Sequence, residues 1–166
     1  MKIDSNKTYT VKITTTQGEM TANLLPKEAP TTVNNFVFLA REGFYNGVKF
    51  HRIIKGFMVQ TGDPAGNGSG GPGYTFVDEP VTSNYDRGVL AMANRGPNTN
   101  GSQFFLVHGD DVGLRLPKNY TIFGKVTQGI EVLDQIASVP VAASPSGEMS
   151  VPQSDVRITK VEIEER

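Results

Sequence analysis

The segment that most constrains the fold is residues 50–63, which read FHRIIKGFMVQTGD. Its aromatic and β-branched residues are typical of buried strands, and Lys55-Gly56 divides it into two short strands joined by a turn. Since side chains alternate between the faces of a strand, we expect Arg52 on one face of the first strand, and Gln60 with Met58 on one face of the second. This pattern indicates a polar pair on the wall of an apolar pocket. The alternative interpretation is an arginine exposed on the surface of a barrel.

Other strands are predicted where apolar residues alternate or form short runs. These segments are 9–13, 20–24, 88–94, 103–108, 120–126 and 156–163. Gln17-Gly18 joins the first two segments as a β-hairpin. In the last segment the apolar positions switch from even to odd numbers, which indicates a bulge or a strand that is apolar on both faces.

Helices are predicted in two places, where apolar residues recur at helical spacing. Pro30 suits the first turn of one helix, and Gly43 stands where its C-terminal cap belongs. Gly129 precedes the other helix. The apolar face of the first helix carries Val33, Phe36, Val37 and Ala40, and that of the second carries Ile130, Leu133, Ile136 and Ala137.

Together these elements predict a mainly β fold, an eight-stranded, antiparallel, closed β-barrel capped by two α-helices. A chain of 166 residues most simply forms one domain, so residues 1–166 are expected to be a single domain. Residues 140–152 are predicted to form a polar loop, and so is the glycine-rich segment 62–73. The latter contains a G-x-G-x-x-G match, but Pro72 and a strand-like run follow it, where a dinucleotide site needs a helix.

Charge and composition exclude several classes of function. A net charge of −1 gives no electrostatic footprint for nucleic acid or for an anionic membrane. No segment approaches the roughly 20 apolar residues of a membrane-spanning helix. The absence of cysteine excludes disulfides, thiol catalysis and thiolate metal sites. The polar residues 1–6 lack the apolar core of a secretion signal, so a cytoplasmic location is expected, and no pattern requires more than a monomer.

The residues present give little support to nucleophilic or metal-dependent catalysis. His51 and His108 are the two imidazoles, and no serine stands in a G-x-S-x-G motif. The run 108–111, HGDD, is typical of a solvated loop rather than of a metal site. No metal and no cofactor are therefore expected. What remains is a site without a general base or a nucleophile, suited to binding an extended peptide and holding an apolar ring.

The sequence also resembles a known family. FHRIIKGFMVQTGD, followed downstream by MANRGPNTNGSQFF and IFGKV, is similar to the cyclophilin family of peptidyl-prolyl cis-trans isomerases from about Thr10 to Ile163. The resemblance implies an isomerase that acts on proline-containing peptides and unfolded proteins and assists folding. By position, Arg52 matches the family's catalytic arginine and Gln60 the residue that orients it. The positions that match substrate-binding residues are His51, Phe57, Met58, Ala93, Asn94, Arg95, Gln103, Phe105, Leu116 and Tyr120.

Departures from the family pattern occur at three positions. The chain has no tryptophan, and Arg115 or one of its neighbours stands where many members carry the tryptophan associated with tight cyclosporin binding, so weak binding of this drug is expected. Tyr120 replaces the usual histidine and keeps a ring with a polar tip. Arg95 replaces a small residue at the second sub-pocket, where it would favour acidic residues upstream of the proline.

Two other classes of protein are alternatives to an isomerase. A proline-peptide binding module or chaperone without significant catalysis would use the same fold, although a mere binder has no need of a donor at the prolyl nitrogen. A small-ligand barrel is disfavoured, because the chain has enough phenylalanine, isoleucine, valine and leucine to fill the barrel interior.

Overall fold

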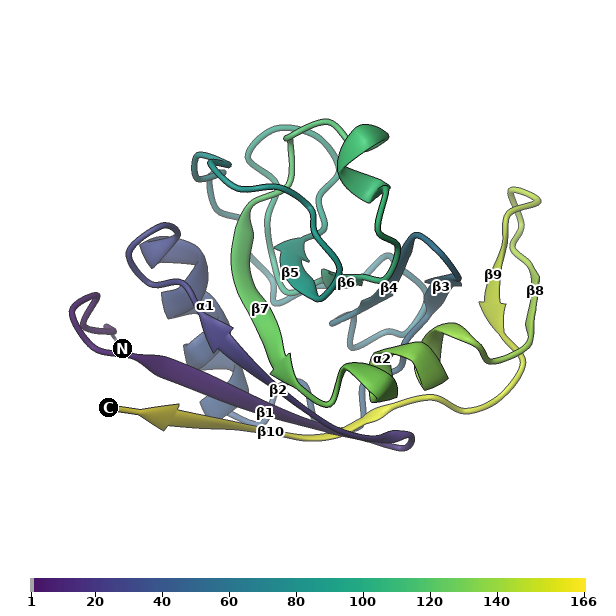
Figure 1. Ribbon diagram of the computed structural model, residues 1–166, viewed down its shortest axis with the longest axis horizontal. Helices are drawn as coiled ribbons and strands as arrows, with labels where there is room; N and C mark the ends of the chain where they lie inside the picture. The colour runs from purple at the N-terminus through teal and green to yellow at the C-terminus, as the bar shows by residue number, and fades with distance from the viewer. Residues whose placement is uncertain (1) are drawn as a thin grey trace.

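The computed structural model describes residues 2–166, in which eight strands form one curled antiparallel sheet (Figure 1). The strands of this sheet are β1 (Tyr9–Thr15), β2 (Gly18–Leu24), β3 (Arg52–Ile54), β4 (Met58–Thr61), β5 (Val89–Met92), β6 (Phe104–Val107), β7 (Ile122–Gln128) and β10 (Ile158–Glu165). Their order across the sheet is β10-β1-β2-β7-β5-β6-β4-β3. The mainly β fold is confirmed, and each segment predicted to be a strand contributes to this sheet.

The predicted hairpin and the predicted bulge both involve β1. β1 and β2 pair as a hairpin, with Thr15 opposite Gly18. On its other side β1 pairs with β10, where Thr14 is opposite Lys160 but Thr15 is opposite Ile158. One residue of β10 is therefore left unpaired, which is the bulge that the switch of apolar positions predicted.

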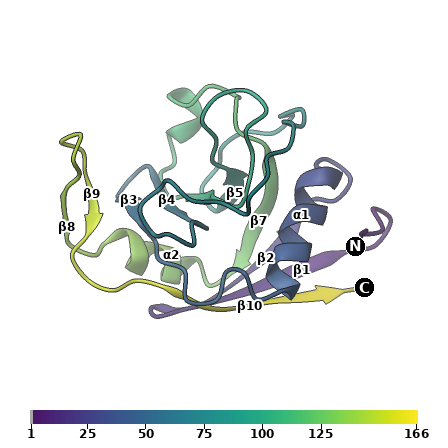
Figure 2. The same cartoon turned by 180° about the vertical axis from the view of Figure 1, so that it is seen from behind.

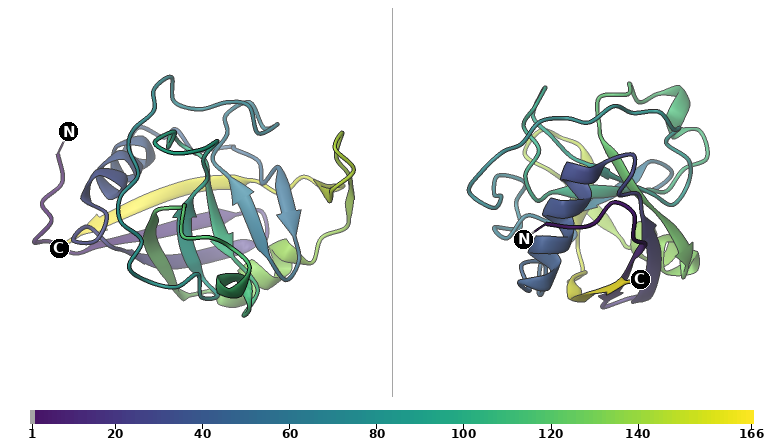
Figure 3. Two further views of the ribbon diagram at one scale, coloured as in Figure 1. Left: turned by 90° about the horizontal axis from the view of Figure 1, so that it is seen from above. Right: turned by 90° about the vertical axis from the view of Figure 1, so that its left-hand side faces the viewer.

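The prediction of a closed barrel is wrong. β10 and β3 are the two edges of the sheet, and no ladder joins them within residues 2–166 (Figure 3). A few bonds cross the gap: Lys49 forms a bridge with Arg157, and the backbone N–H of Phe50 donates to the carbonyl of Val156 over 2.9 Å. β3 is three residues long and β9 (Met149–Pro152) lies against it, so β10 finds no partner there. The sheet is a half-barrel.

Both predicted helices are confirmed, as α1 (Pro30–Arg41) and α2 (Ile130–Ala137). Figure 2 shows α1 beside the two ends of the chain and α2 nearer to the opposite end of the molecule. α1 lies against β10, and α2 lies against β2, β3 and β4. Within residues 2–166 neither helix has the length and apolar character needed to cross a membrane.

The start of α1 is capped by a residue distant in sequence. Ala29 precedes the helix and offers no side-chain acceptor. Instead, the Glu79 carboxylate accepts hydrogen bonds from the backbone N–H groups of Thr31 and Thr32, both over 2.9 Å, and from the Thr32 hydroxyl over 2.7 Å. A carboxylate at this position satisfies free N–H groups and complements the helix dipole.

The core has two parts, separated by the central strands. In the main part, Phe36 of α1 packs against Tyr45, Phe104 and Phe123 with ring centroids 5.2–5.4 Å apart. Strands β5 and β6 are buried on both faces, so Phe104 points into the main core while Phe105 points into a second apolar cluster. Met58 also belongs to this second cluster. The second cluster forms the floor of the site described below.

The predicted polar loop 140–152 instead contains a hairpin. β8 (Val141–Ala143) pairs with β9, and the connection between them is the hairpin tip, residues 144–148. Figures 1 and 3 show this hairpin projecting from the body beyond β3. The apolar residues at 141–143 and at 149 and 151, on either side of Ser-Pro-Ser-Gly, were the signal for a hairpin, but the polar composition of the segment obscured it.

Candidate active site

A cavity of about 630 Å³ lies between β3, β4, β6 and the β8–β9 hairpin. Ten of the twelve residues predicted for the site line it: His51, Arg52, Phe57, Met58, Gln60, Ala93, Asn94, Phe105, Leu116 and Tyr120. The other two, Arg95 and Gln103, line a neighbouring cavity of about 550 Å³, which shares Gln60, Ala93 and Asn94 with the first. Segments far apart in the sequence therefore meet at one cavity, and its volume is in the range expected of a ligand site.

The floor of this cavity is apolar. Phe105 and Met58 are buried in the second cluster, and Leu116 and Phe57 pack against it while remaining partly exposed. The Tyr120 and Phe105 rings pack edge-to-face, with their centroids 5.7 Å apart. Such a floor suits a small apolar ring and offers no competing hydrogen bonds to it.

Arg52 and Gln60 lie directly opposite each other on β3 and β4, as the strand alternation predicted. Nη1 of Arg52 donates to Oε1 of Gln60 over 3.3 Å and lies 4.0 Å from Sδ of Met58. The Arg52 side chain is 37% exposed, so the guanidinium stands at the rim of the apolar floor and within reach of a ligand. It is not an arginine on the outer surface of a barrel.

A chain of amide hydrogen bonds runs from Arg52 to the glycine-rich loop (residues 62–73). Because a guanidinium only donates, Gln60 presents its oxygen to Arg52, which leaves its nitrogen to donate to Oε1 of Gln103 over 3.0 Å. Nε2 of Gln103 then donates to the carbonyls of Gly68 and Gly70 over 3.0 and 2.9 Å. Arg52 thus fixes the orientation of both glutamines, and Gln103 braces the loop.

Within the glycine-rich loop, Asp63 holds the backbone together. Its side chain is fully buried, with 0% exposure. Burial by itself would raise the pKa of Asp63, but four backbone N–H groups outweigh it and lower the pKa below the usual value. These donors belong to Ala65, Asn67, Gly68 and Gly70. A Cβ atom at Gly70 would overlap Oδ1 of Asp63, so this wall of the cavity requires a glycine at that position.

Two of the remaining predicted polar residues, Asn94 and Arg95, have protein partners, whereas Nδ1 of His51 is buried without a hydrogen-bond partner among residues 2–166. Nδ2 of Asn94 donates to the carbonyl of Asn119 over 2.8 Å, and Nη2 of Arg95 donates to the carbonyl of Gly68 over 2.8 Å. Burial lowers the pKa of His51, which favours the neutral imidazole at neutral pH. The cavity therefore presents one permanent cation from the predicted set, Arg52.

Glu148 is the charged residue of the cavity that the sequence did not reveal. Its carboxylate accepts two hydrogen bonds from Arg52, from Nε over 2.8 Å and from Nη2 over 2.9 Å. The Arg52 guanidinium lowers the pKa of Glu148 to about 2. The hairpin also contributes Ser144, Pro145, Ser150 and Val151 to the lining.

His108 supports the turn that precedes Phe57. Its Nδ1 accepts from the backbone N–H of Gly56 over 2.9 Å, while Nε2 contacts Oδ1 of Asp134 at 2.9 Å. Nη2 of Arg87 also donates to Asp134, over 2.7 Å. Among residues 2–166 no cluster of three or more histidine or acidic side chains is arranged to hold a metal ion.

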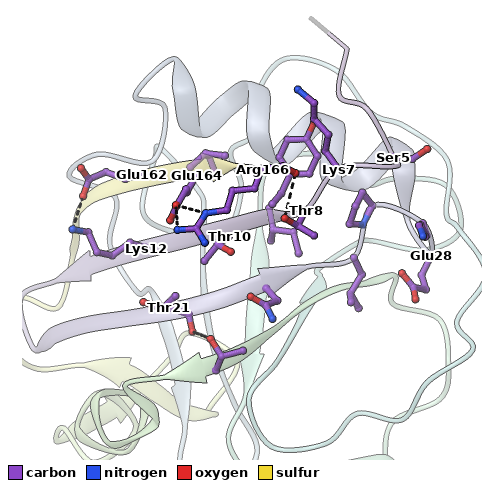
Figure 4. A pocket seen from close by; sticks show the side chains of 18 of the residues that line it. Ser5, Lys7, Thr8, Thr10, Lys12, Thr21, Glu28, Glu162, Glu164 and Arg166 are labelled. Atoms are coloured by element: carbon purple, nitrogen blue, oxygen red, sulfur yellow. Dashed lines mark hydrogen bonds and ion pairs between the residues drawn. The ribbon is translucent and has the colours of Figure 1, made fainter.

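A wider hollow of about 1030 Å³ lies on the outer face of β1, β2 and β10 (Figure 4). Four of its charged residues form ion pairs on the surface, Lys12 with Glu162 and Arg166 with Glu164. Exposed ion pairs of this kind are ordinary surface features. The cavity beside Arg52 is therefore the stronger candidate for an active site.

Comparison with known proteins identifies the family of the chain. The family model "Cyclophilin type peptidyl-prolyl cis-trans isomerase/CLD" matches residues 10–163. The chain belongs to the cyclophilin-type peptidyl-prolyl cis-trans isomerase family. The resemblance noted in the sequence is therefore confirmed.

Curated relatives carry the same family description. This chain is 44% identical over 168 residues to "Probable peptidyl-prolyl cis-trans isomerase B" of Mycobacterium tuberculosis, an alignment that covers 91% of this chain and 53% of that protein. The chain thus spans about half the length of that relative. It is 47% identical over 136 residues to "Peptidyl-prolyl cis-trans isomerase-like 3" of Gallus gallus, which covers 79% of this chain and 83% of the relative.

Solved structures of similar fold come from the same family. The crystal structure of a cyclophilin-type peptidyl-prolyl cis-trans isomerase from Cryptosporidium parvum superposes with a TM-score of 0.86 at 36% identity and covers 95% of this chain and 98% of that one. The same Cryptosporidium protein crystallised in the presence of the dipeptide Ala-Pro gives a TM-score of 0.85, also at 36% identity, and covers 93% of this chain and 98% of that one.

Proposed function

We propose that this chain catalyses cis–trans isomerisation of X–Pro bonds in peptides and unfolded proteins and thereby assists folding, with Arg52 donating to the prolyl nitrogen. The observation that carries the proposal is the guanidinium of Arg52, held by Gln60 at the rim of an apolar floor. The family membership and the Ala-Pro dipeptide used with the Cryptosporidium protein support the same substrate class.

The chemistry needs neither a nucleophile nor a general base. Resonance holds the planar amide behind a barrier of about 18–20 kcal/mol, and uncatalysed X–Pro exchange takes tens of seconds or more. When the bond twists, the nitrogen lone pair is no longer delocalised, so the nitrogen becomes a hydrogen-bond acceptor. A donor placed there binds the twisted state and not the planar one, which is the condition for acceleration. Arg52 is permanently charged and can donate without transferring a proton.

The energy of one hydrogen bond indicates that Arg52 is one of several contributions to the rate acceleration. One charge-assisted hydrogen bond of about 1.5–3 kcal/mol accounts for roughly a 10- to 150-fold acceleration. The twisted amide is also less dipolar than the planar one, so an apolar floor favours it. Holding the ring against Phe105, Met58 and Leu116 while the preceding carbonyl rotates supplies the orientation.

Exchange spectroscopy by NMR on a short Ala-Pro peptide tests the proposal. We expect the wild type to accelerate cis–trans exchange and Arg52→Ala to lose most of that acceleration while remaining folded. Arg166→Ala is the matched control, because its side chain is 77% exposed and lines the hollow of Figure 4 instead. A wild type that binds the peptide without changing its exchange rate would make the chain a proline-peptide binding module.

Cyclosporin is expected to bind weakly. Arg115 and its neighbours stand where many family members carry tryptophan, and the Arg115 guanidinium lies 5.3 Å from the centroid of the Phe57 ring. It also donates to the carbonyl of Gly56 and to Asp111, over 3.1 Å in each case. A charged and already engaged side chain replaces an apolar surface for the drug. Titration with cyclosporin that gave nanomolar affinity would contradict this expectation.

Arg95 is proposed to set a preference upstream of the proline. It is exposed, and it spans the second cavity by donating to Gly68. A permanent cation here favours acidic residues in the substrate. Turnover of matched peptides bearing glutamate or lysine upstream of the proline measures the preference, and equal rates would argue against it.

A further inference from the structure

The β8–β9 hairpin brings a carboxylate to the guanidinium on which the proposed function depends. The two hydrogen bonds from Arg52 to Glu148 are parallel, with Nε on Oε1 and Nη2 on Oε2. A bidentate pair of this kind fixes both the direction and the plane of a guanidinium. The single bond to Gln60, at 3.3 Å, cannot do so alone.

This pair also determines which part of the guanidinium faces the cavity. Glu148 occupies the Nε–Nη2 edge, so Nη1 is turned toward Gln60 and toward Met58 on the apolar floor. An arginine has five N–H donors, and the bonds to Glu148 and Gln60 use three of them. The two that remain are one on Nη1, which lies 4.0 Å from the weakly accepting sulfur of Met58, and one on Nη2.

We propose that Glu148 is a positioning residue for Arg52: it holds the guanidinium so that the remaining Nη1 and Nη2 donors face the prolyl nitrogen of the substrate. This inference rests on the proposed isomerase function, since it assigns Glu148 a part in that reaction. Glu148 does not touch the prolyl bond in this arrangement and acts through Arg52.

Hydrogen bonds within the hairpin tip hold Glu148 in place beside Arg52. Its backbone closes on itself, with the N–H of Ser144 donating to the carbonyl of Glu148 over 2.7 Å and that of Gly147 to the carbonyl of Ser144 over 2.9 Å. Within residues 2–166, the side-chain hydrogen bonds that connect the tip to the body of the molecule are those between Glu148 and Arg52. The hairpin itself is anchored by packing, since β9 lies against β3 and Val141 packs against the main core, and the Glu148–Arg52 pair adds a polar tie at its tip.

The decisive experiment measures kcat and KM on an Ala-Pro peptide for four proteins: wild type, Glu148→Gln, Arg52→Ala and the double variant. Glutamine keeps the shape of the side chain but loses the charge and one acceptor. We expect Glu148→Gln to lower kcat roughly 10-fold with little change in KM, less than the roughly 100-fold that a 1 Å misplacement of a catalytic group costs. In the Arg52→Ala background the same change should have no effect, because the residue that it positions is gone.

Additional variants separate positioning from mere support of the hairpin. Ser146→Ala alters the same tip without touching the cavity lining and should keep wild-type kcat. Glu148→Asp retains charge and both oxygens and should recover part of the activity. The Nε–H resonance of Arg52 should move upfield in Glu148→Gln, which reports the pair without reference to turnover.

The outcomes are distinct. An unchanged kcat in Glu148→Gln, or an equal loss with and without Arg52, would overturn the role of Glu148 and leave the isomerase function intact. A wild type that binds peptide without accelerating exchange would refute the proposed function, and positioning for catalysis with it.

Discussion

The two segments that flank the cavity are both organised by a carboxylate, but in opposite ways. Asp63 is fully buried and bonds to backbone N–H groups of its own glycine-rich loop. The Glu148 side chain, in the hairpin tip, is 36% exposed and pairs with Arg52 of β3. The Asp63 carboxylate therefore holds one wall of the cavity together. The Glu148 carboxylate is proposed to orient Arg52 and contributes little to stability. The comparison predicts that Asp63 matters mainly for stability and Glu148 mainly for activity.

Removal of the Asp63 carboxylate should give the largest effect on stability. Asp63→Ala removes a buried carboxylate and leaves four backbone N–H groups without their acceptor, so the free energy of unfolding should fall by about 3 kcal/mol. Chemical denaturation measures the change, with Asp110→Ala as a control because Asp110 is exposed. A loss of less than about 1 kcal/mol would show that water replaces the carboxylate without penalty.

Adjacent glycines in the same loop provide a finer test. A Cβ at Gly70 overlaps Oδ1 of Asp63, so Gly70→Ala should destabilise the fold by about 1–3 kcal/mol. At Gly71 a Cβ meets no atom within 4 Å, so Gly71→Ala should change stability by no more than about 0.5 kcal/mol. Equal effects of the two substitutions would mean that the loop relaxes around either side chain.

Acid unfolding should distinguish the two carboxylates. The pKa of Asp63 is lowered from 3.8, so the unfolded chain takes up a proton there before the folded one does, and stability is lost as the pH falls below about 3.8. Asp63→Asn should remove much of this pH dependence while lowering stability at neutral pH. The pKa of Glu148 is lowered as well, to about 2, but solvent screens its exposed pair with Arg52, so Glu148→Gln should remove less of the pH dependence than Asp63→Asn. Unfolding free energies measured between about pH 2 and pH 7 decide the matter.

Glu148→Gln should have the smallest effect on stability. Ion pairs at this exposure contribute about 0–1 kcal/mol, so the midpoint of denaturation should hardly move. The measurement uses the same denaturation assay, with Ser146→Ala beside it. A loss comparable to that of Asp63→Ala would show that the hairpin is part of the core structure, and the distinction between the two segments would fail.

Sequence patterns predicted the features that depend on residues close together in the chain. The opposition of Arg52 and Gln60 followed from strand alternation and a tight turn, both of which involve neighbouring residues. The contact of Glu148 with Arg52 spans 96 positions and lies in a segment that was predicted to be a loop, so no local pattern could reveal it. Asp63 was visible as a polar residue after a strand, but its role depends on how the following loop folds back. Barrel closure failed as a prediction for the same reason, because it depends on where the distant edges β3 and β10 come to lie.

The position of β1 between β2 and β10 has a consequence for the order of folding. A hairpin such as β1–β2 forms in about 1–10 μs, whereas pairing with β10 must wait until the last strand has been synthesised. Until then the outer edge of β1 is unpaired, and α1 lacks one of the strands that it contacts. Non-local contacts of this kind slow folding. We therefore expect the arrival of β10 to be the event that commits the nascent chain to its native state.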